Sequence, residues 1–171
     1  MAKSVSPLII PADVAPAEKE RFTENYHAIT NDAGRLFMFA CDQKVEHLND
    51  DFSQLPFAEM KQSEHFFKIA QAIQSGAMAT NFGLINRYGP YYPELNYIVK
   101  INGKTNATVV DEPISNAWYS VEEVATTMQD AKLNLRGIGY TLYLGSEHEQ
   151  SMLIQAAQTV YDAHQHGLVA L

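Results

Sequence analysis

Titratable side chains crowd together just after a short apolar run near the start of the chain. The segment Phe37–Asp51 reads FMFACDQKVEHLNDD, and the ten positions from Asp42 onward carry six charged residues or histidines. Asp42, Lys44, Glu46 and His47 supply carboxylate, ammonium and imidazole groups, which can transfer protons and bind polar substrates. The apolar run predicts a buried strand, and in parallel α/β folds the reactive side chains cluster at the carboxyl ends of strands.

Two later segments also place reactive side chains at the end of an apolar run. In NYIVKINGKTN, Lys100 and Asn102 share one face, because side-chain direction repeats every two residues, and Lys104 follows. In TLYLGSEHE, Tyr143 lies near the end of a predicted strand, and Ser146 opens a helix whose free N–H groups could hold an anion. We therefore expect these residues to bind substrate, with the lysines creating a local positive potential for an anionic one.

The pairing of an aspartate with a lysine from another strand leaves two interpretations open. Burying the charges of Asp42 and Lys100 is costly unless they pair, so the pair is either catalytic or purely structural. From the residues alone, Lys100 could form a Schiff base, because a desolvated lysine beside another cation has a lowered pKa. For Lys44, Glu46 and His47, the favoured interpretation is a solvated loop, with catalysis as the alternative.

The remaining candidate ligands do not predict a metal centre. His164 and His166 lie at one end of a predicted helix and Glu147–Glu149 at the other, about 25 Å apart at about 1.5 Å per residue, so they cannot share an ion. Imidazolium is favoured near a helix C-terminus, which gives the two histidines a structural role. Cys41 is expected to be a small core residue. We predict no metal and no cofactor.

The elements that must position these residues alternate between helix and strand. The predicted helices run over 16–29 and 63–75 and onward from two S-x-x-E capping boxes, Ser120 with Glu123 and Ser146 with Glu149. The predicted strands run over 36–41, 77–82, 97–102 and 137–144, with a last one beginning in LVAL at the end of the chain. This alternation predicts βαβ units and a parallel sheet.

Two observations favour a closed barrel over a doubly wound sheet. No G-x-G-x-x-G follows the first strand, as a dinucleotide fold would require. In GIGYTLYL, alternate bulky residues can face the helices while the other set begins with glycine and becomes polar toward the carboxyl end. A (β/α)8 barrel needs about 250 residues. The predicted fold class is therefore α/β, a TIM-type barrel with only its first four βα units and the start of the fifth strand.

Length, composition and charge limit the domain organisation and the kinds of partner that the chain can have. The 171 residues predict an N-terminal arm and amphipathic helix over 1–30 and a half-barrel over 31–171. The net charge of −8 argues against nucleic acid and anionic membranes as partners. A single cysteine and the absence of a signal-like N-terminus favour the cytoplasm. The sheet of a half-barrel has two open edges, which promote aggregation unless another chain covers them. We therefore expect a homo-oligomer.

Three segments together resemble the archaeal-type class I fructose-bisphosphate aldolases, which are related to deoxyribose-phosphate aldolase. They are FACDQKVEHLNDDF, LNYIVKINGKTN and GIGYTLYLGSEHEQSML, and the similarity runs in matching order from about Leu36 to Leu171. The resemblance implies a TIM barrel that cleaves and forms a carbon–carbon bond of a phosphorylated sugar through a Schiff base, without a metal.

The resemblance also implies residue roles. Asp42 matches an aspartate that binds substrate hydroxyls and assists proton transfer, and Lys100 matches a lysine in the pocket on the third strand. The imine-forming lysine of that family stands on the sixth strand, beyond Leu171. The resemblance therefore makes Lys100 an electrostatic and hydrogen-bonding residue and predicts that this chain alone is inactive.

Three functions remain open at this stage. The first is cleavage or formation of fructose 1,6-bisphosphate, from dihydroxyacetone phosphate and glyceraldehyde 3-phosphate. The second is a related aldolase or transaldolase-like synthase of aromatic amino-acid biosynthesis. The third is a non-catalytic half-barrel that serves as an assembly module.

Overall fold

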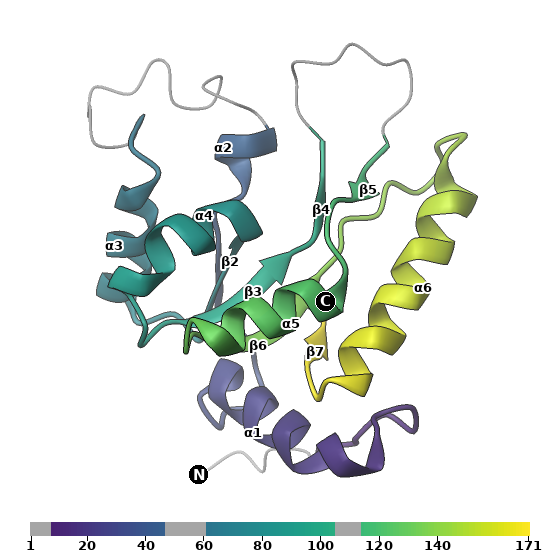
Figure 1. Cartoon of the computed structure of the whole chain (residues 1–171), viewed down its shortest axis with the longest axis horizontal. Coiled ribbons are helices and arrows are strands. Elements are labelled where there is room, and N and C mark those ends of the chain that lie inside the picture. The colour runs from purple at the N-terminus through teal and green to yellow at the C-terminus, as the bar shows by residue number, and fades with distance from the viewer. Residues whose placement is uncertain (1–7, 47–60, 105–113) are drawn as a thin grey trace, which may run out of the picture.

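The computed structural model describes residues 8–46, 61–104 and 114–171, and its centre is a parallel sheet (Figure 1). Five strands pair in the order β1 (Met38–Ala40), β2 (Ala77–Asn81), β3 (Asn96–Lys100), β6 (Asn134–Gly139) and β7 (Val169–Ala170). Each parallel strand thus lies beside the one that precedes it in the chain. This order confirms the predicted fold class, the first part of a (β/α)8 barrel.

Helices cover the sheet and one of its ends. They are the 3-10 turns η1 (Pro16–Glu18) and η3 (Gly89–Tyr91) and the α-helices α1 (Lys19–Thr30), α2 (Gln43–Glu46), α3 (Glu64–Ile73), α4 (Phe82–Tyr88), α5 (Val121–Asp130) and α6 (Glu149–Gln165). In Figure 1, α1 lies below the sheet, whereas α2 lies above it. Also above it is a small antiparallel pair that the sequence did not predict, β4 (Asn102–Gly103) with β5 (Asn116–Ala117). Among the described residues, no helix is long and apolar enough to cross a membrane.

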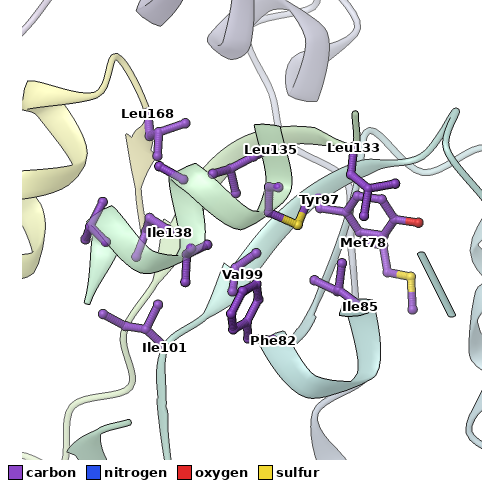
Figure 2. Close-up of a cluster of buried hydrophobic side chains, with 14 of the residues drawn as sticks. Met78, Phe82, Ile85, Tyr97, Val99, Ile101, Leu133, Leu135, Ile138 and Leu168 are labelled. Carbon is purple, nitrogen blue, oxygen red and sulfur yellow. The ribbon is translucent and has the colours of Figure 1, made fainter. Parts of the chain in front are cut away.

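The alternation of side chains along the strands divides the apolar residues between two faces. Tyr97, Val99 and Ile138 belong to the main core, which packs beneath the helices (Figure 2). On the other face, Ile98 packs with Ala77 and with Ile29 of α1. The inner face of the sheet is therefore apolar at its amino end, where α1 closes it, and open at its carboxyl end.

A glycine allows α1 to approach the sheet. The backbone N–H of Gly76 donates to the carbonyl of Phe37, and a β carbon at this position would overlap the carbonyl oxygen of Ile29. Any larger residue would push the end of α1 away from β2. The prediction of a helix over 16–29 is confirmed, and this contact explains where that helix packs.

The two predicted capping boxes have different outcomes. Ser120 and Glu123 form the box as expected, each side chain bonding the backbone N–H of the other residue. The prediction for Ser146 and Glu149 is wrong, because α6 begins only at Glu149 and has no side-chain cap. The Glu149 carboxylate instead accepts from the backbone N–H of Gly145, whose φ of +85° turns the chain.

The strand predicted over 137–144 is shifted toward the N-terminus. The observed β6 begins at Asn134 and ends at Gly139. Two polar residues near its start concealed it from the hydrophobic pattern: the Asn134 side chain binds the Pro93 carbonyl, and the Arg136 guanidinium binds the amide oxygens of Asn96 and Asn25.

Candidate active site

The ammonium group of Lys100 is held between two carboxylates at the carboxyl end of the sheet. Its Nζ donates to Oδ2 of Asp42 at 2.6 Å and also to Oε1 of Glu46. The Lys100 side chain is 8% exposed, and those of Asp42 and Glu46 are 23% and 11% exposed. The predicted meeting of Asp42 and Lys100 is confirmed, and Glu46 joins them.

Three elements bring these groups together. Asp42 follows β1, Lys100 ends β3, and Glu46 ends the single turn of α2 that folds back over the strand ends. Before these strand ends, the inner face of β1 and β2 carries the small side chains of Ala40 and Ala79, which pair with one another. Glu46 is the member of this cluster that sequence reasoning did not single out, because a solvated loop was the favoured interpretation of its surroundings.

The two carboxylates fix the charge of the lysine. Burial by itself disfavours the ammonium form, but the hydrogen bonds to Asp42 and Glu46 and their negative charges outweigh burial and raise the pKa of Lys100 above its ordinary value. A free amine is needed to attack a carbonyl carbon. Lys100 is therefore a poor nucleophile and a good source of fixed positive charge.

A cavity of about 210 Å³ opens beside this cluster on the inner face of the sheet. Asp42 and Lys100 line it together with Gly139, which ends β6, and Thr141, two positions further along the chain. Ile138, which precedes Gly139 in the sequence, is fully buried in the main core on the helix side. The predicted division of this strand into a small, polar inner set and a bulky outer set is thus confirmed for these three residues. A larger hollow of about 580 Å³ lies between α1, α5 and β6, at the opposite end of the sheet.

Two further predicted residues meet near the cluster. Nζ of Lys104 lies 5.0 Å from the centre of the Tyr143 ring, within the range of a cation–π contact. Burial, followed by the negative charge of Glu46, raises the pKa of the Tyr143 hydroxyl. Tyr143 is therefore protonated at neutral pH and can donate a hydrogen bond.

Asn102 is fully buried and already engaged with the backbone. Its amide nitrogen donates to the carbonyls of Ser115 and Thr141, and its oxygen accepts from the N–H of Thr141 at 2.9 Å. The side chain thereby takes the place of a strand partner for the segment after β6. It positions Thr141, which lines the cavity.

The other predicted residues lie apart from the cluster or outside the description. Ser146 is buried, its hydroxyl accepts from the N–H of His148, and it is not among the described residues that line the cavity. Lys44 lies in α2, but its side chain is outside the described part of the structure, as is His47 altogether.

The remaining titratable candidates have structural partners. His164 contacts Asp13 at 2.9 Å, which lowers the pKa of that carboxyl, and His166 contacts Glu122 at 3.0 Å. The described residues contain no group of three or more potential metal ligands of the types His, Cys, Asp and Glu. Cys41 is buried, and burial raises the pKa of its thiol to about 12.

The chemistry available here is that of a buried charge cluster beside a small cavity. A carboxylate such as Asp42 can accept a proton or a hydroxyl hydrogen bond, and the ammonium of Lys100 can stabilise negative charge that develops on an oxygen. The cluster contains two carboxylates and one ammonium group. One carboxylate can therefore bind substrate while the other keeps the lysine charged.

Comparison with known proteins identifies a family and several relatives of this chain. The family described as DeoC/LacD family aldolase matches residues 36–171. A protein of Methanocaldococcus jannaschii named fructose-bisphosphate aldolase/6-deoxy-5-ketofructose 1-phosphate synthase is 42% identical over 166 residues, which are 96% of this chain and 52% of that protein. A class 1 fructose-bisphosphate aldolase of Thermoproteus tenax is 30% identical, with 82% of this chain and 49% of that protein covered.

Solved structures agree with the sequence relatives. A fructose-bisphosphate aldolase from Slackia heliotrinireducens superposes with a TM-score of 0.90 at 43% identity, covering 98% of this chain and 54% of that one. A Schiff-base-forming fructose-1,6-bisphosphate aldolase superposes with a TM-score of 0.72 at 29% identity, with 87% and 55% covered. The chain thus spans about half the length of the curated relatives that it matches.

Proposed function

The chain belongs to the DeoC/LacD family of aldolases, and on that premise we propose that it forms the first half of a class I aldolase active site. The reaction would cleave or form fructose 1,6-bisphosphate, joining dihydroxyacetone phosphate to glyceraldehyde 3-phosphate. The second half of the site, including the lysine that forms the imine, would come from the part of the relatives' length that this chain does not span.

The observation that carries the proposal is the pairing of Lys100 with Asp42 and Glu46. A site that breaks a bond between two hydroxylated carbons needs a group that accepts the hydroxyl proton and a cation beside the charge that forms. Asp42 would take the proton, and Lys100 would supply the positive charge. The raised pKa of Lys100 supports this division, because a lysine that remains charged cannot itself attack the substrate carbonyl.

The other residues would act around this centre. Lys104 and Tyr143 would bind substrate at the mouth, the lysine attracting a phosphate and the tyrosine donating a hydrogen bond. Lys44, His47 and Ser146 remain proposed substrate contacts. For Asn102 the contribution would be indirect, since its amide is engaged with the backbone of Thr141.

Two features bear on where and how the protein would act. We propose a cytoplasmic enzyme, because its substrates would be phosphorylated sugars and its single cysteine is a buried thiol. We also propose a homo-oligomer, because α6 exposes Leu153, Ile154, Val160 and Tyr161.

One relative favours a second candidate. The Methanocaldococcus jannaschii protein is named for two activities, and the second is synthesis of 6-deoxy-5-ketofructose 1-phosphate. We therefore keep a related synthase as the second candidate function, the alternative for which the sequence analysis expected a place in aromatic amino-acid biosynthesis. Assaying the full-length protein with both kinds of substrate separates the two functions.

Trapping the imine tests the proposal directly. The full-length protein is incubated with dihydroxyacetone phosphate, reduced with borohydride and mapped by peptide mass spectrometry. We expect one modified lysine outside residues 1–171 and an unmodified Lys100. A label on Lys100 would overturn its assigned role. The absence of any label, together with absent activity on both substrates, would favour the non-catalytic assembly module.

A further inference from the structure

One buried amide beside the charge cluster has no partner in the described part of the chain. Asn81 is 4% exposed, and neither its amide nitrogen nor its amide oxygen makes a hydrogen bond to any described residue. A buried amide without partners costs about 1–3 kcal/mol. Natural structures keep few such groups, and a binding role is one reason to keep them.

The register of the sheet places Asn81 next to the proposed catalytic groups. Asn81 ends β2 and is the direct partner of Lys100 on β3, and paired residues of parallel strands point to the same face. On the other side, Ala40 pairs with Ala79, and the N–H of Cys41 continues the ladder by donating to the Ala79 carbonyl. Two positions beyond Ala40, Asp42 is therefore level with Asn81.

Among the described residues, none gives this amide a structural role. Asn81 stands at the N-cap position of α4, where an asparagine side chain commonly binds the first backbone N–H groups, yet it makes no cap bond. Its neighbour Thr80 points to the opposite face and bonds the Cys41 carbonyl. In the register of the sheet, Asn81 therefore lies between Asp42 and Lys100, and neither its donor nor its acceptor bonds a described residue.

We propose that Asn81 is a substrate-binding residue of this site and hydrogen-bonds a hydroxyl of the sugar phosphate. A hydroxyl both donates and accepts, which matches the two unused groups of an amide. A substrate hydroxyl bound by Asp42 would bring the adjacent carbon and its hydroxyl beside Asn81. The inference rests on the proposed aldolase function and narrows it, because it assigns the site to substrates hydroxylated next to the bond that breaks.

Substituting the amide by an apolar side chain of similar size separates a binding role from a structural one. In the full-length protein, Asn81→Leu should leave the urea midpoint of unfolding unchanged or raised, because it removes an unpaired buried polar group. The same change should lower kcat/KM for fructose 1,6-bisphosphate by about 10- to 100-fold. Ser75→Ala is the matched control: it removes a buried side-chain oxygen that likewise has no partner among the described residues, just before the opposite end of β2, and it should leave the kinetics unchanged.

Deoxy substrates identify the contact. The wild-type protein should discriminate by about 10-fold or more against either the 3-deoxy or the 5-deoxy analogue, and Asn81→Leu should reduce that ratio to about threefold or less. Unchanged kinetics in Asn81→Leu would overturn the inference. A lower urea midpoint of Asn81→Leu, together with an equal loss of kcat/KM on all substrates, would also overturn the inference and would give the amide a structural role. An inactive wild type would instead refute the proposed function itself, so the two failures are distinguishable.

Discussion

Lys100 and Asp42 form an ion pair although their strands are not neighbours. Strand β2 lies between β1 and β3, yet Nζ of Lys100 lies 2.6 Å from Oδ2 of Asp42. Adjacent strands are about 4.8 Å apart, so the two backbones are separated by about twice that distance. The long lysine side chain spans this gap across β2, on the face of the sheet that also carries Ala79 and Asn81.

Removing the charge of Lys100 should destabilise the fold strongly. Lys100→Met keeps the side-chain length but leaves Asp42 and Glu46 buried without a counter-charge, which costs about 3–5 kcal/mol. Urea unfolding measures the change in the free energy of unfolding. The control is Lys68→Met, which removes an exposed i,i+4 pair with Glu64 and should cost less than about 0.5 kcal/mol. Equal effects of the two substitutions would contradict the buried pairing.

The stability that Lys100 contributes should disappear only at high pH. Its pKa in the folded protein is raised above 10.5, the ordinary value that applies to the unfolded chain. The folded state therefore holds the proton more tightly, and this contribution is fully present below 10.5 and is lost as the pH rises through the raised value. The difference in unfolding free energy between wild type and Lys100→Met should be constant at about pH 8–10 and shrink above that range. A difference that grows with pH would show that the pKa is lowered.

The close approach of α1 to the sheet should make Gly76 intolerant of substitution. Gly76→Ala places a methyl group on the Ile29 carbonyl oxygen, and we expect a loss of about 1–3 kcal/mol. Gly83→Ala is the control, because a β carbon at Gly83 in α4 would meet nothing within 4 Å. That change should be neutral or slightly stabilising. Thermal unfolding of the two variants tests the contrast, and an unaffected Gly76→Ala would show that α1 does not pack here.

The order of elements could be predicted from the sequence because each strand is a short apolar run and each helix has an apolar face. The prediction was less accurate where polar side chains act as structural parts. Arg136 lies within β6 and satisfies its guanidinium on Asn25 of α1 and Asn96 of β3, residues far away in the sequence. After β6, Asn102 replaces a strand partner for Thr141. Neither contact produces a periodic pattern.

The site shows the same limit. The rule that reactive residues follow the carboxyl ends of strands was sufficient to bring Asp42 and Lys100 together. It could not distinguish Glu46 from its charged neighbours, because only the turn of α2 directs that carboxylate onto the lysine. Ser146 and Glu149 match a capping box by spacing, but Glu149 bonds Gly145 instead. Local spacing in the sequence therefore predicted which residues lie near the site, but it was less accurate about the contacts that these residues make.

The positive charge of Lys104 should affect substrate binding more than the chemical step. Lys104 contacts the Tyr143 ring rather than a carboxylate, so no described acid neutralises its charge. In the full-length protein, Lys104→Gln should raise KM for a phosphorylated substrate by about 10-fold with little change in kcat, the pattern of an interaction made equally in the ground and transition states. Added salt should weaken wild-type binding more than binding to Lys104→Gln, because screening acts on the lost charge. Lys19→Gln, on α1 at the other end of the barrel, is the control and should leave KM unchanged. A lower kcat with unchanged KM in Lys104→Gln would assign the lysine to the chemical step instead.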